Sequence, residues 1–151
     1  MKLPHKDYFF VGIQFLLFFI YLFNFQLYQL HFPDVLAQTG LIIGLIGIVV
    51  LVLALLQLST NLSPFPTPKS SAQLIQTGLY KLIRHPIYTG IILLLGGYGF
   101  YKNSVYKISI TLLLYVLFYF KSSYEEKLLQ NKYSNYLEFK KTRGRFFPKL
   151  F

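Results

Sequence analysis

Residues 37–58 read AQTGLIIGLIGIVVLVLALLQL, an apolar run of 22 residues without one charged side chain. An α-helix rises about 1.5 Å per residue, so about 20 apolar residues cross the hydrocarbon core of a bilayer. The run therefore predicts a transmembrane helix. It places the chain among the integral membrane proteins of the all-α class.

Three further apolar runs flank this stretch. Residues 8–30 form a run of 23 that polar residues such as Gln14, Asn24 and Gln26 interrupt, whereas residues 87–101 and 106–120 are runs of 15 residues each. The two shorter runs need their flanking residues to cross a bilayer, or they thin it locally; a re-entrant hairpin is the alternative. We expect a single domain over residues 1–151 with about four transmembrane helices.

The composition agrees with a lipid environment. Hydrophobic residues make up 54% of the chain and charged residues only 13%. A soluble domain carries roughly 25% charged residues, so this chain has too few to cover its surface in water. The first run is too long for the apolar core of a signal peptide. The lack of cysteine excludes disulfides, thiolate catalysis and cysteine-based metal sites.

The basic residues predict an orientation. Two lysines precede the first run, the segment 59–86 holds three lysines and arginines, and the tail after residue 120 holds eight, which is 13 on one side. The turn 31–36 has none and the turn 102–107 has two. The positive-inside rule then places both termini and the long loop in the cytoplasm. A basic rim facing anionic lipid explains the net charge of +10 without nucleic acid.

The long loop carries two distinctive segments. Residues 61–69 read NLSPFPTPK, and prolines at every second position favour extended polyproline-like backbone, for which a stiff linker is the simplest interpretation. Arg84, His85 and Pro86 then open the third run. Proline suits the first position of a helix, whose free amides attract anions beside these two donors. An interfacial helix start with a snorkelling arginine is the alternative.

Two of the five acidic residues, Glu125 and Glu126, are adjacent where the fourth run ends. Neighbours on a helix point about 100° apart, so one carboxylate can face a pocket while the other meets water or Lys127. A solvated helix turn is the alternative. Apolar side chains then recur at helical spacing among lysines, which predicts a C-terminal amphipathic helix on the membrane surface. These side chains are Leu129, Tyr133, Tyr136 and Leu137.

Together these segments resemble the isoprenylcysteine carboxyl methyltransferase family and its phospholipid methyltransferase relatives. The resemblance covers about 90 residues, from 61 to 148. It rests on the order and spacing of NLSPFPTPK at 61–69, TGLY at 77–80, RHPIYTG at 84–90, Glu125-Glu126, Tyr133, Tyr136 and RFFP at 145–148.

The resemblance implies a methyltransferase that uses S-adenosylmethionine. The resemblance also implies that segments 61–90 and 121–148 hold the cofactor at the cytoplasmic face. This fits the lack of the strand and glycine-rich turn of a Rossmann domain. The Gly96-Gly97-Tyr98-Gly99 run and the Gly40-x-x-x-Gly44 pattern are interpreted instead as helix-packing sites. Arg84 and Lys121 are the expected catalytic residues. The expected cofactor-binding residues are Arg84, His85, Pro86, Tyr88, Gly90, Tyr124, Glu125 and Glu126.

Each part of the cofactor has an expected partner. Arg84, His85 and the helix start would hold its carboxylate, and one of the two glutamates would accept from its ammonium or ribose. Tyr88 or Tyr124 would cover the adenine or the sulfonium.

The acceptor is expected to be lipid-like or prenylated. An isoprenylcysteine-type carboxylate is already a nucleophile, whereas an amine must first be neutral, and both stay open. Lys121 stands where the family often has arginine, and lysine cannot clamp a carboxylate at two points. The site is expected in the cytoplasm, at the plasma membrane of a bacterium or the endoplasmic reticulum of a eukaryote.

Two other functions are alternatives. One is a membrane sterol-type reductase that shares the C-terminal core but uses a nicotinamide cofactor, and the other is a non-enzymatic four-helix membrane protein. Membrane lipids are expected partners, but nucleic acids and metals are not. In particular, His5 and His31 lack partner acids at ligand spacing.

Overall fold

The computed structural model describes residues 3–25 and 32–149. Within these ranges the chain is helical, and its only β-type pairing is an isolated bridge between Ile83 and Gly144. The all-α class is therefore confirmed. The elements are α1 His5–Leu22, α2 Asp34–Leu58, η1 Ser59–Asn61, η2 Gly78–Lys81, α3 Pro86–Tyr101, α4 Val105–Lys132 and α5 Tyr136–Thr142.

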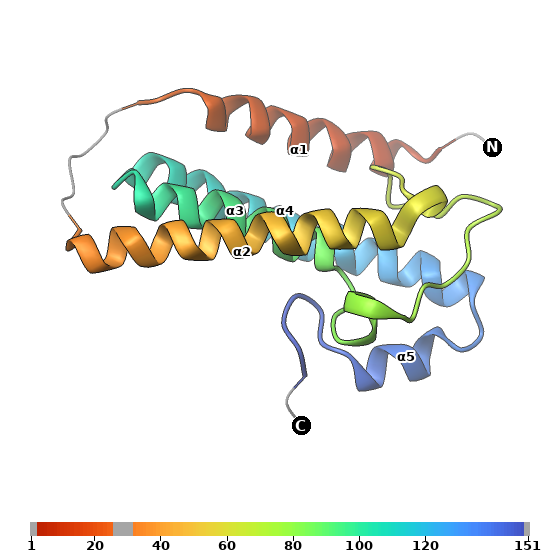
Figure 1. Ribbon diagram of the computed structural model, residues 1–151. Coiled ribbons are helices and arrows are strands. Elements are labelled where there is room, and N and C mark those ends of the chain that lie inside the picture. Colours follow the sequence, from red (N-terminus) through yellow and green to blue (C-terminus); the bar gives the residue numbers. More distant parts are fainter. Residues whose placement is uncertain (1–2, 26–31, 150–151) are drawn as a thin grey trace.

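Helices α1 to α4 run side by side, and η2, α5 and the C-terminal segment gather beneath one end of them (Figure 1). Helices α2 and α4 are long and apolar enough to cross a membrane, while α3 is apolar but shorter. The outward side of α2 exposes many large apolar side chains, among them Ile42, Leu45 and Val49. Water-soluble monomers rarely expose such a continuous apolar face, so this surface fits membrane association.

Two predicted helix ends differ from the structure. The first run was expected to be helical to Leu30, but α1 ends at Leu22 and Phe23 is extended; residues 26–30 lie outside the described residues. The last carbonyls of α1 accept hydrogen bonds from α4 instead: Tyr106 Oη donates to Ile20 O (2.7 Å) and Lys107 Nζ to Tyr21 O (2.9 Å). The other helix, α4, does not stop at residue 120 but continues to Lys132.

The predicted C-terminal amphipathic helix is divided in the structure. Tyr133 has extended backbone, and its hydroxyl donates to Ala72 O at 2.6 Å, which separates α4 from the seven-residue α5. Tyr136 and Phe139 of α5 are buried within the protein. The helical spacing of the apolar residues predicted one continuous helix. A tertiary hydrogen bond such as that of Tyr133, which accompanies the break, leaves no trace in this spacing.

Glycines bring α2 and α3 into backbone contact. A Cβ added to Gly97 would lie 2.4 Å from Gly44 N and 2.5 Å from Gly40 O, and one added to Gly47 would lie 2.4 Å from Leu94 N. These positions confirm the helix-packing interpretation of Gly97 and of the Gly40-x-x-x-Gly44 pattern. Gly96 differs, because its added Cβ would meet only Thr111 Cγ2 at 3.5 Å.

The adjacent glycines of α3 give a matched test of this contact. We expect Gly97→Ala to lower the free energy of unfolding by about 1–3 kcal/mol, because the two backbones must move apart. Gly96→Ala should be neutral or slightly stabilising, since alanine favours helix. Reversible unfolding in bicelles would measure both variants, and equal effects would contradict backbone contact at Gly97.

Candidate functional site

A buried carboxylate gathers four segments of the chain. Glu126 of α4 is fully buried, and its Oε1 lies 3.1 Å from His85 Nε2, 3.4 Å from Arg84 Nε and 3.7 Å from Arg145 Nε. Its Oε2 lies 3.0 Å from Lys140 Nζ of α5. These five residues are called the Glu126 cluster below. It joins α4, the segment before α3, α5 and the tail.

Backbone hydrogen bonds hold the tail in place beside the start of α3. Arg84 N donates to Gly144 O (2.9 Å) and His85 N donates to Arg145 O (3.1 Å). Thr89 Oγ1, one turn into α3, donates to Phe146 O at 2.7 Å. The tail is therefore part of the site.

Glu125 and Glu126 point in different directions, as neighbours on a helix do. Glu125 Oε2 accepts a hydrogen bond from Tyr88 Oη (3.0 Å) and lies 3.8 Å from His85 Nδ1. Its side chain is 26% exposed, against 1% for Glu126. The expectation that the second glutamate meets water or Lys127 is therefore wrong, because that carboxylate is enclosed by cations.

Glu125 faces a cavity of about 280 Å³. The cavity is walled by apolar side chains of α2 and α3 and by the polar side chains Gln14, Arg84, His85, Lys121 and Glu125. A second cavity of about 100 Å³ lies toward the loop 61–75 and shares Tyr80, Arg84 and Glu125 with the first. Ligand sites usually measure roughly 300–1,000 Å³, so the two together reach the lower end of that range.

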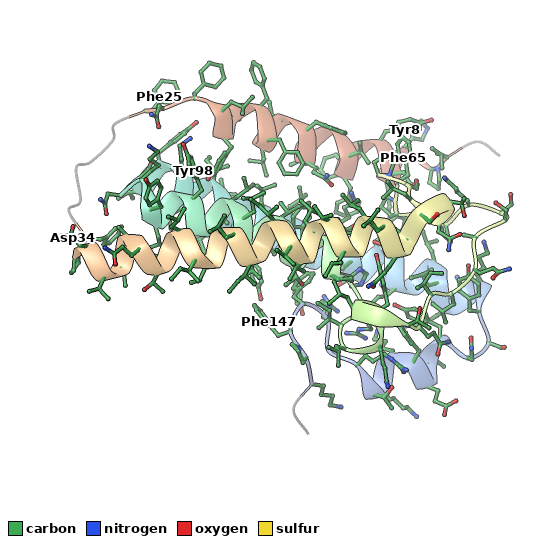
Figure 2. The ribbon with its side chains drawn as sticks, in the orientation of Figure 1. Tyr8, Phe25, Asp34, Phe65, Tyr98 and Phe147 are labelled. Atoms are coloured by element: carbon green, nitrogen blue, oxygen red, sulfur yellow. The ribbon has the colours of Figure 1, made fainter. Side chains whose placement is uncertain are left out.

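The proline-rich loop forms part of this site. Pro66 is fully buried, Pro64 lines the larger cavity, and Thr67 N donates to Asp7 Oδ2 of α1 at 3.1 Å. The loop also packs against α1 through Phe65 and Tyr8, whose ring centroids are 5.5 Å apart (Figure 2). A passive linker would not be buried in this way.

Lys121 is buried in the cavity wall. Its Nζ donates to Gln14 Oε1 (2.6 Å) and to Pro64 O (2.8 Å), and it lies 5.6 Å from the centroid of the Tyr88 ring. Two of its three N–H groups thus donate hydrogen bonds to neutral acceptors. Within the described residues, no carboxylate oxygen lies within 4.0 Å of this ammonium. A buried cation of this kind favours an anionic or strongly polar ligand group nearby.

Five of the nine site residues expected from the sequence line a cavity, and four do not. Arg84, His85, Tyr88, Lys121 and Glu125 line the larger cavity. The other four line neither cavity. Glu126 lies within its cluster, Pro86 is buried at the start of α3, Gly90 packs against Leu51 of α2, and Tyr124 stacks on Phe10 of α1.

Tyr88 is placed to orient Glu125. Its ring stacks on Phe118 with centroids 4.5 Å apart and lies parallel to the His85 ring with centroids 5.4 Å apart. Its hydroxyl donates a hydrogen bond to Glu125. These contacts fix the glutamate more than they offer an aromatic face to a ligand.

Tyr80 and Gln14 line the cavity and were missed in the sequence. Tyr80 follows Gly78, whose φ of 59° favours glycine, and Gln57 Oε1 accepts a hydrogen bond from Leu79 N at 2.8 Å. Burial, and then the charge of Glu125, raise the pKa of Tyr80 above its ordinary value, so its hydroxyl stays protonated at neutral pH. A glutamine inside an apolar run was the available signal for Gln14.

Within the described part of the chain, no three His, Cys, Asp or Glu side chains are grouped so that they could hold a metal ion. His5 is exposed at the start of α1, and His31 lies outside the described residues.

Substitutions of the two glutamates should change the stability of the protein to different extents. We expect Glu126→Gln to lower the free energy of unfolding by about 3 kcal/mol, because it leaves several cations together without their buried counter-charge. Glu125→Gln should cost less than about 1 kcal/mol, since its partner there is a neutral hydroxyl. Denaturation in bicelles measures both, and equal losses would argue against Glu126 as the organising residue.

Comparison with protein families gives one finding. The family model described as phospholipid methyltransferase matches residues 35–136, from the start of α2 to the start of α5. No curated protein matches the chain. The family match covers more than half of the chain and includes the Arg84-His85 and Glu125-Glu126 pairs that the structure brings together. The chain belongs to the phospholipid methyltransferase family, the membrane methyltransferases that include the isoprenylcysteine carboxyl methyltransferases.

Proposed function

We propose that this protein transfers a methyl group from S-adenosylmethionine to an apolar, lipid-like acceptor. One observation carries the proposal: a carboxylate, Glu125, and the cationic groups of Arg84 and Lys121 line one cavity whose other walls are largely apolar. Opposite charges at a shared rim complement a zwitterion such as the methionine part of the cofactor. Family membership supports the same chemistry.

The donor set fits this cofactor. Glu125 has carboxylate oxygen left for an ammonium or ribose hydroxyls, because within the described residues Tyr88 is its one hydrogen-bond donor. Arg84 and His85 would hold the carboxylate. Tyr80, which lines both cavities, is better placed than Tyr88 or Tyr124 to cover the adenine. Bound S-adenosylmethionine would supply an electrophilic methyl group, and the protein would contribute position and exclusion of water.

Lys121 would serve the acceptor. With Gln14 and Pro64 using two of its protons, Lys121 has one N–H left to hold an acceptor oxygen. That single contact suits a carboxylate of the isoprenylcysteine type, which needs no general base. It also suits the phosphate of a phospholipid whose amine is methylated.

The four-crossing topology is also part of the proposal. Both termini and the site would lie in the cytoplasm, on the side that collects 13 of the 15 lysines and arginines. The membrane would be the plasma membrane in a bacterium or the endoplasmic reticulum in a eukaryote. Helices α1 and α3 have 18 and 16 residues, so the bilayer would thin locally around them.

Cofactor binding tests the proposal directly. Calorimetry on the detergent-purified chain should show binding of S-adenosylmethionine but not of NADPH, the cofactor of the reductase alternative. Glu125→Gln should weaken binding about 30-fold, which is about 2 kcal/mol for one charge-assisted contact. Glu138→Gln, an exposed glutamate on α5, is the matched control and should bind like wild type.

Two results would count against the proposed function. NADPH binding would favour the reductase, and the absence of binding by either cofactor would favour a non-enzymatic membrane protein.

A further inference from the structure

A buried aspartate in the first turn of α1 lines neither cavity of the site. Asp7 is fully buried, and its Oδ2 accepts a hydrogen bond from Thr67 N at 3.1 Å. Its Oδ1 has no hydrogen-bond partner, and within the described residues no cationic nitrogen lies within 4.0 Å of the carboxylate. A buried carboxylate with a single partner is costly. An ion pair therefore does not explain its burial, as it does for Glu126.

The segment that Asp7 holds is the stiff tip of the loop, residues 63–68. Prolines at alternate positions fix the backbone angle φ there, and the middle one, Pro66, is fully buried. The bond from Thr67 N to Asp7 is the one hydrogen bond between this loop and α1 in the described part of the chain. Because the tip is stiff, fixing Thr67 also fixes Pro64, three residues earlier.

Pro64 is one of the two residues that hold the ammonium of Lys121. The carbonyl of Pro64 accepts from Lys121 Nζ at 2.8 Å, and Gln14 Oε1 of α1 accepts from the same atom at 2.6 Å. Asp7 and Gln14 are both buried and lie seven residues apart, which is two turns, on one face of α1. Helix α1 thus reaches Lys121 by two routes, directly through Gln14 and through the loop from Asp7.

The two routes together determine where the third N–H of Lys121 points. An ammonium has three donors at tetrahedral angles, so two fixed hydrogen bonds fix the direction of the third. With one acceptor removed, the group rotates about the bond to the other and this direction is lost. Lys121 lines the larger cavity together with Glu125, and an oriented donor there contributes to catalysis by holding a reactant in place.

We propose that Asp7 is a positioning residue for Lys121. Through Thr67 it holds the loop so that Pro64 keeps the free N–H of Lys121 directed toward the acceptor oxygen. A carboxylate suits this task because its hydrogen bond to a backbone N–H is stronger than that of a neutral acceptor. The role of Lys121 rests on the proposed function, whereas the tether does not. Helix α1 lies before residues 35–136, so it would serve the site from outside the segment that matches the family.

Two labelling measurements test the tether without requiring activity. The full chain in phosphatidylcholine nanodiscs would be compared with Asp7→Ala, which removes the acceptor of the hydrogen bond. Loss of this charge-assisted bond should make deuterium exchange of residues 61–69 about 10-fold faster. Lys121, released from Pro64, should react with trace acetic anhydride about 10-fold faster, as measured by mass spectrometry of its peptide.

Two further variants serve as controls. Asp7→Asn keeps an oxygen that can accept from Thr67 N, so exchange and acetylation should both stay within about 3-fold of wild type. Asp34→Asn alters the other aspartate of the chain, which is exposed at the start of α2, and should behave like wild type in both measurements.

Kinetics connect the tether to the reaction. With tritiated S-adenosylmethionine, Asp7→Ala should raise the KM for N-acetyl-S-farnesylcysteine about 10-fold, the effect of one misdirected hydrogen bond. Asp7→Asn should restore most of this loss. A wild-type chain that methylates neither this acceptor nor membrane lipid would defeat the proposed function, and the two labelling measurements would still decide the tether.

Two results would overturn the assignment of Asp7. Faster exchange of residues 61–69 with unchanged acetylation of Lys121 would mean that Asp7 holds the loop but not the lysine. Equal effects of Asp7→Asn and Asp7→Ala would mean that the hydrogen bond to Thr67 is not what matters. If Asp7→Ala does not fold, Thr67→Pro removes the donor of the same bond between two residues that are already proline, and the acetylation rate of Lys121 decides.

Discussion

Burial of the Glu126 carboxylate is the interaction on which the site depends. A lone ion in a low-dielectric interior is costly, so Glu126 is stable there only with its cations, and those cations come from three other segments. Holding them fixes the start of α3, α5 and the tail around α4. The preceding residue of α4, Glu125, is thereby directed into the cavity. One carboxylate organises the site, and its neighbour is left to meet a ligand.

The same molecule separates polar chemistry from apolar packing along its length. At one end lie the cavities, the loop and the ionic groups. Elsewhere α2 and α3 pack through glycines with their backbones in contact, and α2 exposes an apolar surface suited to lipid. Helix α1 spans both regions, since Gln14 reaches the polar cavity and Phe18 and Tyr21 lie among apolar side chains of α2 and α3.

Much of the fold could be predicted from the sequence, because it depends on local features. An apolar run such as 37–58 predicts a membrane helix, and a small residue such as Gly97 predicts close helix packing. The meeting of Arg84 and His85 with the glutamates was predictable, since a helical hairpin returns the chain to the same side. The orientation of the glutamates was not, because it depends on Lys140 and Arg145 arriving from α5 and the tail. The Gln14–Lys121 contact joins residues 107 positions apart, and no local pattern encodes such a pair. The early end of α1 likewise depends on side chains of α4.

Transfer of a labelled methyl group tests the central claim most directly. The purified chain in vesicles of total membrane lipid, with N-acetyl-S-farnesylcysteine added, would be incubated with S-adenosylmethionine tritiated on its methyl group. We expect tritium to move into an organic-extractable product. Release of that label by mild base would identify a carboxyl ester, and its retention would identify an N-methyl lipid. Tritium that stays in the aqueous phase, although the cofactor binds, would contradict methyl transfer to an apolar acceptor at this site.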